Sequence, residues 1–347
     1  MKPKVYITRA MSKDATDMIA QVCDVEVNVK DAPATRDELI ENIRDKGGII
    51  CMLTDRIDKE VMDAAPMLKV ISTMSVGFEH IDVEEATKRG IYIGNTPGVL
   101  TDATADLTFA LILATARHIP QADRFVRQGE WKISWSPSLF LGKSLWGATL
   151  GIIGFGRIGR AVAKRAKGFN MNVLYNSRTR IPRDEEKRLG VRYATLDTLL
   201  KRSDFVTIHT PLTKDTYHII DEGRLRLMKR DAILINTSRG ATVDEASLAR
   251  ALKEGWIAGA GLDVFQKEPI QMDNPLIGLD NVVLLPHIGS ATSETRRMMA
   301  HIAAKNLLLG IGGKKPLYCV NPEAKKGRSK SGIYTKPLSP SHHMPGL

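Results

Sequence analysis

The sequence has few cysteines, no cluster of metal ligands and no long apolar run. Its three cysteines, Cys23, Cys51 and Cys319, are far apart and odd in number, which favours free thiols over a disulfide framework. Apart from the adjacent His342 and His343, no cysteine or histidine pair has metal-ligand spacing, so we predict no metal. No uncharged apolar run reaches the ~18 residues of a membrane span, and the N-terminus has no signal-peptide core. We therefore predict a cytoplasmic protein without a membrane segment.

Acidic residues are outnumbered, and the formal net charge is +11. Five basic residues against one acidic residue follow residue 322, and many of the others alternate with Glu and Asp along helical stretches such as residues 184–188. That distribution is typical of solvated helix faces. We therefore predict no nucleic-acid partner, whereas a basic body suits an anionic substrate and a phosphate-bearing cofactor.

Short apolar runs and helical patterns alternate along residues 1–99. Such alternation predicts a parallel sheet with helices on both faces. Thr35 with Glu38 three residues later predicts a capping box at the start of a helix over residues 35–44. The predicted strands are 5–7, 25–29, 49–53, 70–73 and 91–93.

The same alternation returns in residues 149–287. Near-continuous apolar runs there are typical of strands buried on both faces, and we predict strands at 150–153, 172–175, 205–209, 232–236, 257–264 and 282–285. Helices are predicted over 101–117, 120–128 and 294–309, the last packing on the first region. The fold class is therefore α/β, with two doubly wound parallel-sheet domains.

The predicted domain boundaries follow from these patterns. Residues 1–99 with 288–320 would form a discontinuous substrate domain, and residues 100–287 would form the dinucleotide-binding domain. Residues 321–347 are rich in Lys, Ser, Pro and Gly and cannot bury enough surface to offset their ordering entropy. We predict a disordered tail there.

One glycine-rich stretch lies near the middle of the chain, at residues 149–159. Gly154, Gly156 and Gly159 have the spacing G-x-G-x-x-G, which is weak evidence in a chain with 28 glycines. A buried strand precedes them and an amphipathic helix follows. Together they predict a dinucleotide site, with a tight turn, close backbone approach to the pyrophosphate, and a helix N-terminus facing the phosphates.

The second strand of this unit bears on the choice of cofactor. An NAD-preferring unit has an acidic residue there, which binds the ribose hydroxyls. Here the strand runs into Asn176, Ser177, Arg178 and Thr179, with no acid. A guanidinium can bind a 2′-phosphate with two hydrogen bonds. We predict NADP(H) in preference to NAD(H), with a merely solvated Arg178 as the alternative.

Three polar residues follow predicted strands of the second unit: Arg239, Glu268 and His287. The carboxyl ends of parallel strands face the cleft where ligands bind. A histidine beside a carboxylate makes a general acid and base pair for work near neutral pH. An arginine can hold a substrate carboxylate with two parallel hydrogen bonds. Each residue alone also has a structural explanation.

Four further passages of the chain are distinctive: 74–82 (Met-Ser-Val-Gly-Phe-Glu-His-Ile-Asp), 95–102 (Asn-Thr-Pro-Gly-Val-Leu-Thr-Asp), 259–264 (Gly-Ala-Gly-Leu-Asp-Val) and 285–292 (Leu-Pro-His-Ile-Gly-Ser-Ala-Thr). They resemble the D-isomer-specific 2-hydroxyacid dehydrogenase family, and within it the glyoxylate/hydroxypyruvate reductases. The resemblance covers residues 1 to about 320 and implies a flavodoxin-like substrate domain and a Rossmann cofactor domain with a cleft between them.

The resemblance also implies roles for individual residues. Arg239 would anchor the substrate carboxylate, His287 would exchange a proton with the C2 oxygen, and Glu268 would hold His287. Backbone N–H groups of Val76 and Gly77 would bind the same carboxylate. The expected activity is reduction of glyoxylate or hydroxypyruvate to the D-2-hydroxy acid.

Further contacts are implied for the pocket wall, the dimer and the cofactor. Ser290 would line the pocket, and the helix over residues 101–117 would lie at a homodimer interface. Trp135 would reach the partner's site, although Leu139 stands where some relatives have a second tryptophan. The residues predicted to bind the cofactor are Gly154, Phe155, Gly156, Arg157, Ile158, Gly159, Asn176, Ser177, Arg178, Thr179, Thr210, Pro211, Asp263, His287 and Gly289.

Other dinucleotide-binding proteins are distinguished by specific residues. Short-chain dehydrogenases need Tyr-x-x-x-Lys, and none of the seven tyrosines has a lysine four residues later. Formate dehydrogenases have Gln where this chain has Glu268. A dinucleotide-sensing protein resembling the C-terminal binding protein corepressors keeps the catalytic trio, and only turnover separates it from an enzyme.

Overall fold

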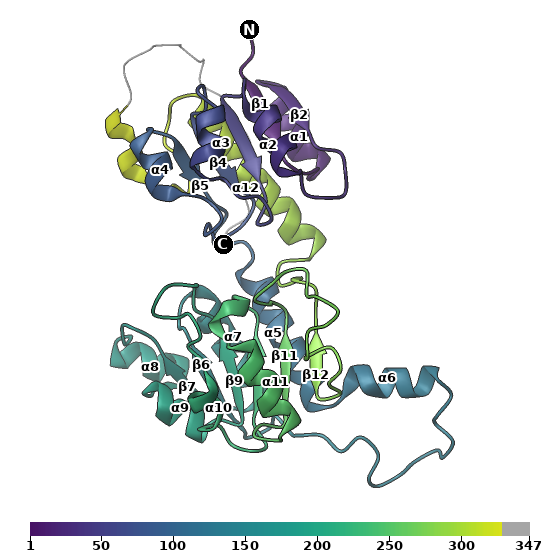
Figure 1. Ribbon diagram of the computed structural model, residues 1–347. Helices are drawn as coiled ribbons and strands as arrows, with labels where there is room; N and C mark the ends of the chain where they lie inside the picture. The colour runs from purple at the N-terminus through teal and green to yellow at the C-terminus, as the bar shows by residue number, and fades with distance from the viewer. Residues whose placement is uncertain (328–347) are drawn as a thin grey trace. The chain divides into compact units, whose positions relative to one another are not determined.

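The computed structural model describes residues 1–327, so residues 328–347 of the predicted tail lie outside the described part. The chain divides into two compact units (Figure 1). Unit 1 contains Met1–Pro97 and the described residues from Arg296, and unit 2 contains Gly98–Thr295.

Unit 1 is built on a parallel sheet in the order β2-β1-β3-β4-β5. This is the flavodoxin-like order, so the predicted fold class is confirmed for this unit. The strands are β1 (Lys4–Ile7), β2 (Asp24–Val27), β3 (Gly48–Cys51), β4 (Val70–Thr73) and β5 (Tyr92–Gly94). The helices are α1 (Lys13–Ala20), α2 (Arg36–Ile43), α3 (Lys59–Ala64), α4 (Val83–Lys88) and most of α12 (Ser293–Ile311).

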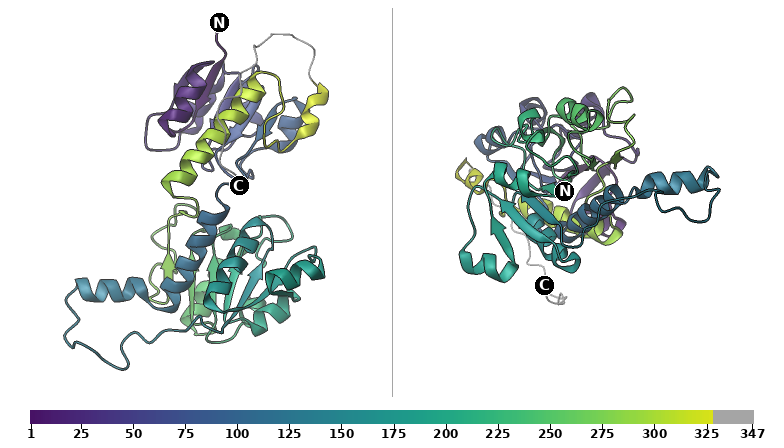
Figure 2. Two further views of the ribbon diagram at one scale, coloured as in Figure 1. Left: turned by 180° about the vertical axis from the view of Figure 1, so that it is seen from behind. Right: turned by 90° about the horizontal axis from the view of Figure 1, so that it is seen from below.

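Two apolar clusters, one on each face, hold this sheet between its helices. Helix α12 lies along one face of the sheet (Figure 2). Its Ala303 and Leu307 pack against residues such as Val70. The Ser72 hydroxyl donates to the carbonyl of Ala303 at 2.8 Å. The predicted packing of this helix on the first region is confirmed. The predicted capping box of α2 is also present, because Thr35 Oγ1 accepts from the N–H of Glu38 while the Glu38 carboxylate accepts from the N–H of Thr35.

Unit 2 is built on a seven-stranded parallel sheet in the order β12-β11-β10-β9-β6-β7-β8. The strand order reverses between β6 and β9, as in the Rossmann fold. The strands are β6 (Thr149–Ile153), β7 (Asn172–Asn176), β8 (Val191–Tyr193), β9 (Phe205–Ile208), β10 (Ile233–Asn236), β11 (Gly259–Leu262) and β12 (Val282–Leu284). Strand β8 was not predicted, because its three residues form too short a pattern.

The helices of unit 2 cover both faces of this sheet. They are α5 (Thr101–Ala116), α6 (Ile119–Arg127), α7 (Arg157–Ala166), α8 (Arg183–Leu189), α9 (Leu196–Arg202), α10 (Glu222–Leu225) and α11 (Glu245–Lys253), with 3-10 turns η1 (Lys167–Phe169) and η2 (Gly240–Thr242). Helices α5 and α7 lie on one face. Helix α6 and the loop after it extend away from the rest of the unit (Figure 2).

The predicted tail begins at residue 321, but the structure is ordered beyond that point. Asn321 is fully buried: its Oδ1 accepts from the N–H of Ile93, and its Nδ2 donates to the carbonyl of Ile91 and to Thr87 Oγ1. A 3-10 turn, η3 (Pro322–Gly327), follows. Composition alone missed this anchor because it depends on one polar side chain satisfied inside unit 1.

Two features are absent from the described residues. No helix among residues 1–327 is long and apolar enough to cross a membrane. The same residues contain no group of three or more His, Cys, Asp or Glu side chains that could hold a metal ion.

Candidate active site

The glycine loop joins β6 to α7 at the point where the strand order reverses. Gly154 has a φ of 92°, and a Cβ there would lie 2.6 Å from the carbonyl carbon of His209. A Cβ on Gly159 would lie 2.2 Å from the Gly154 oxygen, whereas one on Gly156 would meet no atom within 4 Å. The first and third glycines therefore serve tight packing, and the second leaves open backbone at the start of α7. That open backbone fits a dinucleotide pyrophosphate.

The segment after β7 contains two arginines in different surroundings. Arg180 donates to both carboxylate oxygens of Glu186 at 2.7 Å, and the hydroxyl of Tyr175 donates to the same carboxylate. Arg178 is exposed, and among the described residues it has no ion pair. Arg180 is therefore committed to the protein, while the Arg178 guanidinium is available to an anion.

The neutral donors of this segment are partly engaged within the protein. Asn176 Nδ2 donates to the carbonyl of Ala194 at 2.9 Å, and the Ser177 hydroxyl donates to the carbonyl of Thr179 at 2.7 Å. Both interactions hold the loop in shape. Of the side chains predicted to contact the cofactor's ribose, Arg178 and Thr179 are exposed, and Arg178 is the only charged one.

Glu268 and His287 form the central pair of the candidate site. His287 Nδ1 lies 2.7 Å from Glu268 Oε2, and Glu268 Oε1 accepts from the N–H of Phe265 at 3.0 Å. About a third of each side chain is exposed, so the pair is reachable from solvent. Because a carboxylate can only accept, the shared proton belongs to Nδ1 of the histidine. Nε2 is left as the nitrogen that could exchange a proton with a ligand.

The electrostatics of the pair centre on Glu268. Burial raises the pKa of this carboxyl. The hydrogen bond and charge of His287, the N–H of Phe265 and the charge of Arg239 together lower the pKa by more than burial raises it. The net pKa lies below the ordinary value, so Glu268 is ionised at neutral pH. An ionised Glu268 can accept the Nδ1–H of His287 and so fixes the orientation of the ring.

Arg239 lies in a tight turn after β10. The Asn236 side chain donates to the carbonyl of Arg239 at 2.9 Å and accepts from the N–H and hydroxyl of Ser238. The next residue, Gly240, has no room for a side chain, because a Cβ would lie 1.8 Å from the carbonyl carbon of Phe265. This close approach packs the Arg239 turn against the loop that contains Glu268.

Asp263 holds the loop after β12. Its two carboxylate oxygens accept from the N–H groups of Ile288 and Gly289, each at 2.7 Å. Burial raises the pKa of this carboxyl. Thr104 of α5 donates to the carbonyl of Gly289 at 3.1 Å. The structure thus gives Asp263 a positioning role, and the predicted cofactor contact stays a prediction.

The backbone of His287 is itself unusual. Its φ is 55°, in the left-handed region that costs a residue with a side chain roughly 1–3 kcal/mol. The Asp263 carboxylate, bound to the next two N–H groups, holds the chain in this conformation. Strain of this kind is concentrated at functional sites.

Sequence reasoning missed His209, which follows β9 and contacts the glycine loop. Both of its ring nitrogens are buried without a hydrogen-bond partner among the described residues, as is the hydroxyl of its neighbour Thr210. Burial lowers the pKa of His209 to about 3, so this ring is neutral. The signal was a histidine directly after a buried strand, beside Thr210 and Pro211 that were predicted to contact the cofactor.

The other predicted substrate residues lie elsewhere. Ser290 follows His287 by three residues, in the loop that Asp263 holds. Val76 and Gly77 belong to unit 1. Trp135 lies in the loop after α6, with 75% of its surface exposed, and unit 2 does not enclose it. The structure thus joins the Glu268 and His287 side chains directly but does not bring Trp135 to them.

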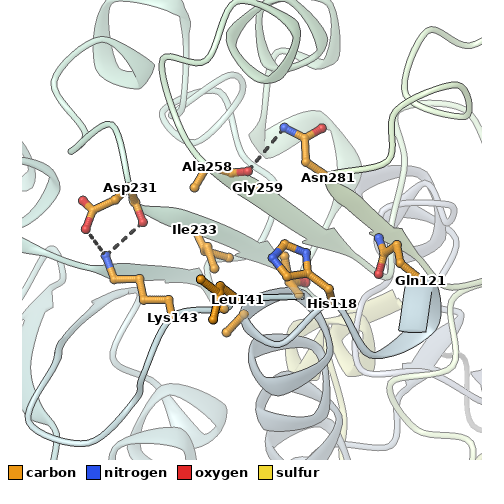
Figure 3. A pocket seen from close by; sticks show the side chains of 12 residues that line it. His118, Gln121, Leu141, Lys143, Asp231, Ile233, Ala258, Gly259 and Asn281 are labelled. Carbon is orange, nitrogen blue, oxygen red and sulfur yellow. Dashed lines mark hydrogen bonds and ion pairs between the residues drawn. The ribbon is translucent and has the colours of Figure 1, made fainter. Parts of the chain in front are cut away.

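A cavity of about 330 Å³ lies at the opposite, amino edge of the seven-stranded sheet (Figure 3). It is lined by Ile233 and Gly259, the first residues of β10 and β11, and by side chains such as His118 and Lys143. Lys143 Nζ is already paired with Asp231 at 2.8 Å. We do not assign the candidate site here, because ligands of open α/β sheets bind at the carboxyl edge.

A parallel sheet of this order with a glycine loop at its switch point defines a dinucleotide-binding protein of the Rossmann class. The family model described as "D-isomer specific 2-hydroxyacid dehydrogenase, NAD binding domain" matches residues 109–289. The glyoxylate reductase of Thermococcus litoralis is 55% identical over 326 residues, which are 93% of this chain and 98% of the relative. That of Pyrococcus furiosus is 54% identical over 331 residues, 94% of this chain and 98% of the relative.

A solved structure supports the same family. The NADPH-dependent glyoxylate/hydroxypyruvate reductase of Sinorhizobium meliloti, in complex with NADP and malonate, matches with a TM-score of 0.81 and 33% identity over 95% of this chain and all of that one. The present chain belongs to the D-isomer-specific 2-hydroxyacid dehydrogenase family. The predictions of the family, of an enzyme and of a nicotinamide dinucleotide as cofactor are confirmed.

Proposed function

We propose that this enzyme reduces glyoxylate or hydroxypyruvate to the corresponding D-2-hydroxy acid, with NADPH as the preferred reductant. The observation that carries the proposal is the His287 and Glu268 pair, with the Arg239 turn packed beside it, after strands of a dinucleotide-binding sheet. Relatives named glyoxylate reductase that are 52–55% identical over nearly the whole chain support the substrate class.

The roles of the trio follow from their chemistry. His287, held at Nδ1 by Glu268, gives a proton from Nε2 to the carbonyl oxygen as that oxygen gains charge. Glu268 stabilises the protonated imidazole and fixes the ring orientation. Arg239 pairs with the substrate carboxylate. When bound, the reduced nicotinamide supplies the hydride to the carbonyl carbon.

Two backbone groups of unit 1 complete the proposed substrate contacts. The N–H groups of Val76 and Gly77 have no hydrogen-bond acceptor among residues 1–327. Adjacent N–H groups of this kind bind anions. We assign them to the substrate carboxylate, and Ser290 to the pocket wall.

The proposed preference for NADP(H) over NAD(H) depends on Arg178. This exposed guanidinium has no ion pair among the described residues, and no acidic residue follows β7 at the position that binds ribose hydroxyls. The Sinorhizobium meliloti relative, whose structure contains NADP, is described as NADPH-dependent. Both observations favour a 2′-phosphate partner at Arg178.

We also propose a homodimer, with the helix over residues 101–117 at the interface and the adjoining arm of residues 119–146 reaching the partner. This arm exposes large apolar side chains, with Trp135 at 75%, Leu141 at 72% and Trp146 at 72% exposure. An exposed apolar surface of this kind marks a protein interface. Size-exclusion chromatography with light scattering should give twice the mass of one chain. A monomer at micromolar concentration would contradict the proposal.

A panel of 2-oxo acids with NADPH and NADH tests the activity. Loss of absorbance at the nicotinamide band with glyoxylate or hydroxypyruvate, faster with NADPH, is the expected result. Tight cofactor binding without turnover of any 2-oxo acid would refute the proposed reaction. The predicted cytoplasmic location stays a prediction.

A further inference from the structure

A chain of side-chain hydrogen bonds runs beneath the loop of Val76 and Gly77 in unit 1. His80 Nε2 lies 3.1 Å from Thr73 Oγ1, which lies 2.7 Å from Ser75 Oγ, and Ser75 Oγ donates to the carbonyl of Gly77 at 2.6 Å. Thr73 and Ser75 are buried, with 0% and 2% exposure. We call His80, Thr73 and Ser75 the hydroxyl chain.

The direction of each bond in the hydroxyl chain follows from proton bookkeeping. The carbonyl of Gly77 can only accept, so Ser75 donates its one hydroxyl proton to that carbonyl. Thr73 must then donate to Ser75, and its own oxygen must accept from His80. His80 therefore carries a proton on Nε2. A histidine without that proton would leave one of the close oxygen contacts without a hydrogen.

A second set of bonds fixes the preceding peptide units of the same loop. The N–H of Thr96 donates to the carbonyl of Ser75 at 2.8 Å, and Asn95 Nδ2 donates to the carbonyl of Val76 at 2.8 Å. A trans peptide directs its C=O and N–H to opposite sides. Holding these two carbonyls therefore turns the N–H groups of Val76 and Gly77 away from Asn95 and Thr96.

Gly77 is the residue that most needs this support. Glycine has the widest choice of backbone conformations and loses the most entropy when it is fixed. Asn95 holds the peptide unit before Gly77, and the hydroxyl chain holds the one after it. With both units fixed, the N–H of Gly77 has one direction before any ligand arrives.

We propose that His80 is a positioning residue for substrate binding: through Thr73 and Ser75 it preorganises the Gly77 backbone that receives the substrate carboxylate. The inference rests on the proposed function, since it needs a carboxylate substrate at Val76 and Gly77. It concerns binding rather than proton transfer, and it adds three side chains of unit 1 that no resemblance had assigned.

The test uses neighbouring hydroxyls of β4 as a matched pair. Thr73→Val keeps the side-chain shape and breaks the hydroxyl chain. Ser72→Ala removes an equally buried hydroxyl on the preceding residue, which bonds to the carbonyl of Ala303 in α12 instead. His80→Ala and His80→Gln form a second pair, because glutamine returns an N–H donor near the place of Nε2.

We expect the KM for glyoxylate to rise about tenfold in Thr73→Val and His80→Ala, with kcat within about twofold of the wild-type value. A lost carboxylate contact weakens ground state and transition state alike, and tenfold is the size expected for one hydrogen bond. The inhibition constant of oxamate, which carries the same carboxylate, should rise in parallel. Ser72→Ala should keep the wild-type KM, and His80→Gln should recover most of the affinity lost in His80→Ala.

Each result has a distinct meaning. If Thr73→Val shifts only the melting temperature, as Ser72→Ala does, or if His80→Gln binds as poorly as His80→Ala, the hydroxyl chain is merely structural and the inference is wrong. If Thr73→Val fails to fold, the comparison of KM between His80→Ala and His80→Gln tests the inference. If the wild-type enzyme turns over no 2-oxo acid, the proposed function fails and the inference falls with it.

Discussion

The two sheets of this protein share an architecture but differ at their carboxyl edges. Beyond the strands of unit 2 lie a glycine loop, an accessible arginine and the Glu268 and His287 pair. Beyond β4 of unit 1 lies a loop that offers backbone N–H groups over buried hydroxyls. With the proposed function, the same doubly wound design supports charged, proton-exchanging side chains in one unit and a neutral anion-binding backbone in the other.

This difference between the two carboxyl edges predicts which kinetic constant a substitution should change. Side chains that exchange protons act on kcat, whereas backbone groups that hold a carboxylate act on KM. Substitutions of His287 and Glu268 in unit 2 should therefore separate cleanly from those of the hydroxyl chain in unit 1.

The largest expected effect is on proton transfer. His287→Ala should lower kcat by about 10³-fold, within the range for loss of a general acid. The cofactor affinity should change far less, because the glycine loop and Arg178 supply the stronger contacts that we propose for the cofactor. Steady-state rates and fluorescence titration with NADPH measure the two quantities. Wild-type-like turnover would remove His287 from the mechanism and erase the contrast between the units.

A smaller loss of kcat is expected for the partner of His287. Glu268→Gln keeps the shape but removes the charge that stabilises the imidazolium, so we expect a decrease of about 10²-fold. The Glu268 carboxyl has a lowered pKa in the folded state. Its stabilising contribution is therefore present above the unfolded pKa of about 4.3 and is lost as the pH falls through the lower folded pKa.

That pH dependence can be measured by acid unfolding. Wild type and Glu268→Gln should lose stability differently as the pH falls below about 4.3, with the wild type showing the additional loss. Parallel acid-unfolding curves would mean that the ion pair contributes nothing to folding.

The next effect concerns the cofactor. Arg178→Ala should raise the dissociation constant of NADPH by about tenfold or more, because a charge-assisted contact is lost, and should leave that of NADH nearly unchanged. Arg188→Ala is the matched control, since Arg188 is a strongly exposed arginine of the same unit whose one ion pair within residues 1–327 is a long one, to Glu185 at 3.7 Å. Equal losses for both cofactors would exclude the 2′-phosphate role.

The smallest effect is expected for a helix cap of unit 1 that is no part of the proposed site. Thr35→Ala removes the capping box of α2 and should cost about 1 kcal/mol of unfolding free energy without changing kcat or KM. Urea unfolding and steady-state kinetics check the two statements. A change in KM would show that stability and substrate binding in unit 1 are not separable in this way.

Much of the fold could be predicted because it depends on local pattern. Apolar runs located most strands, the Thr35 and Glu38 spacing predicted the cap, and the helix predicted over residues 101–117 matches α5. The pattern failed where the signal was short or long-range, as in the three residues of β8 and in the tail that Asn321 anchors. Two arginines two residues apart, Arg178 and Arg180, look alike in sequence, and only packing commits one of them to Glu186.

The sequence by itself determined the family, the dinucleotide loop and the candidate trio, because glycine spacing and the ordered passages are written along the chain. Only the tertiary structure decided the contacts between strands distant in sequence. In the folded chain Glu268 bonds to His287, and Asp263 binds the backbone of the loop after β12. Gly240 packs against the backbone of Phe265. Two hydroxyls connect His80 to Gly77. Such contacts depend on distances of a few ångströms across loops, which no periodicity in one dimension specifies.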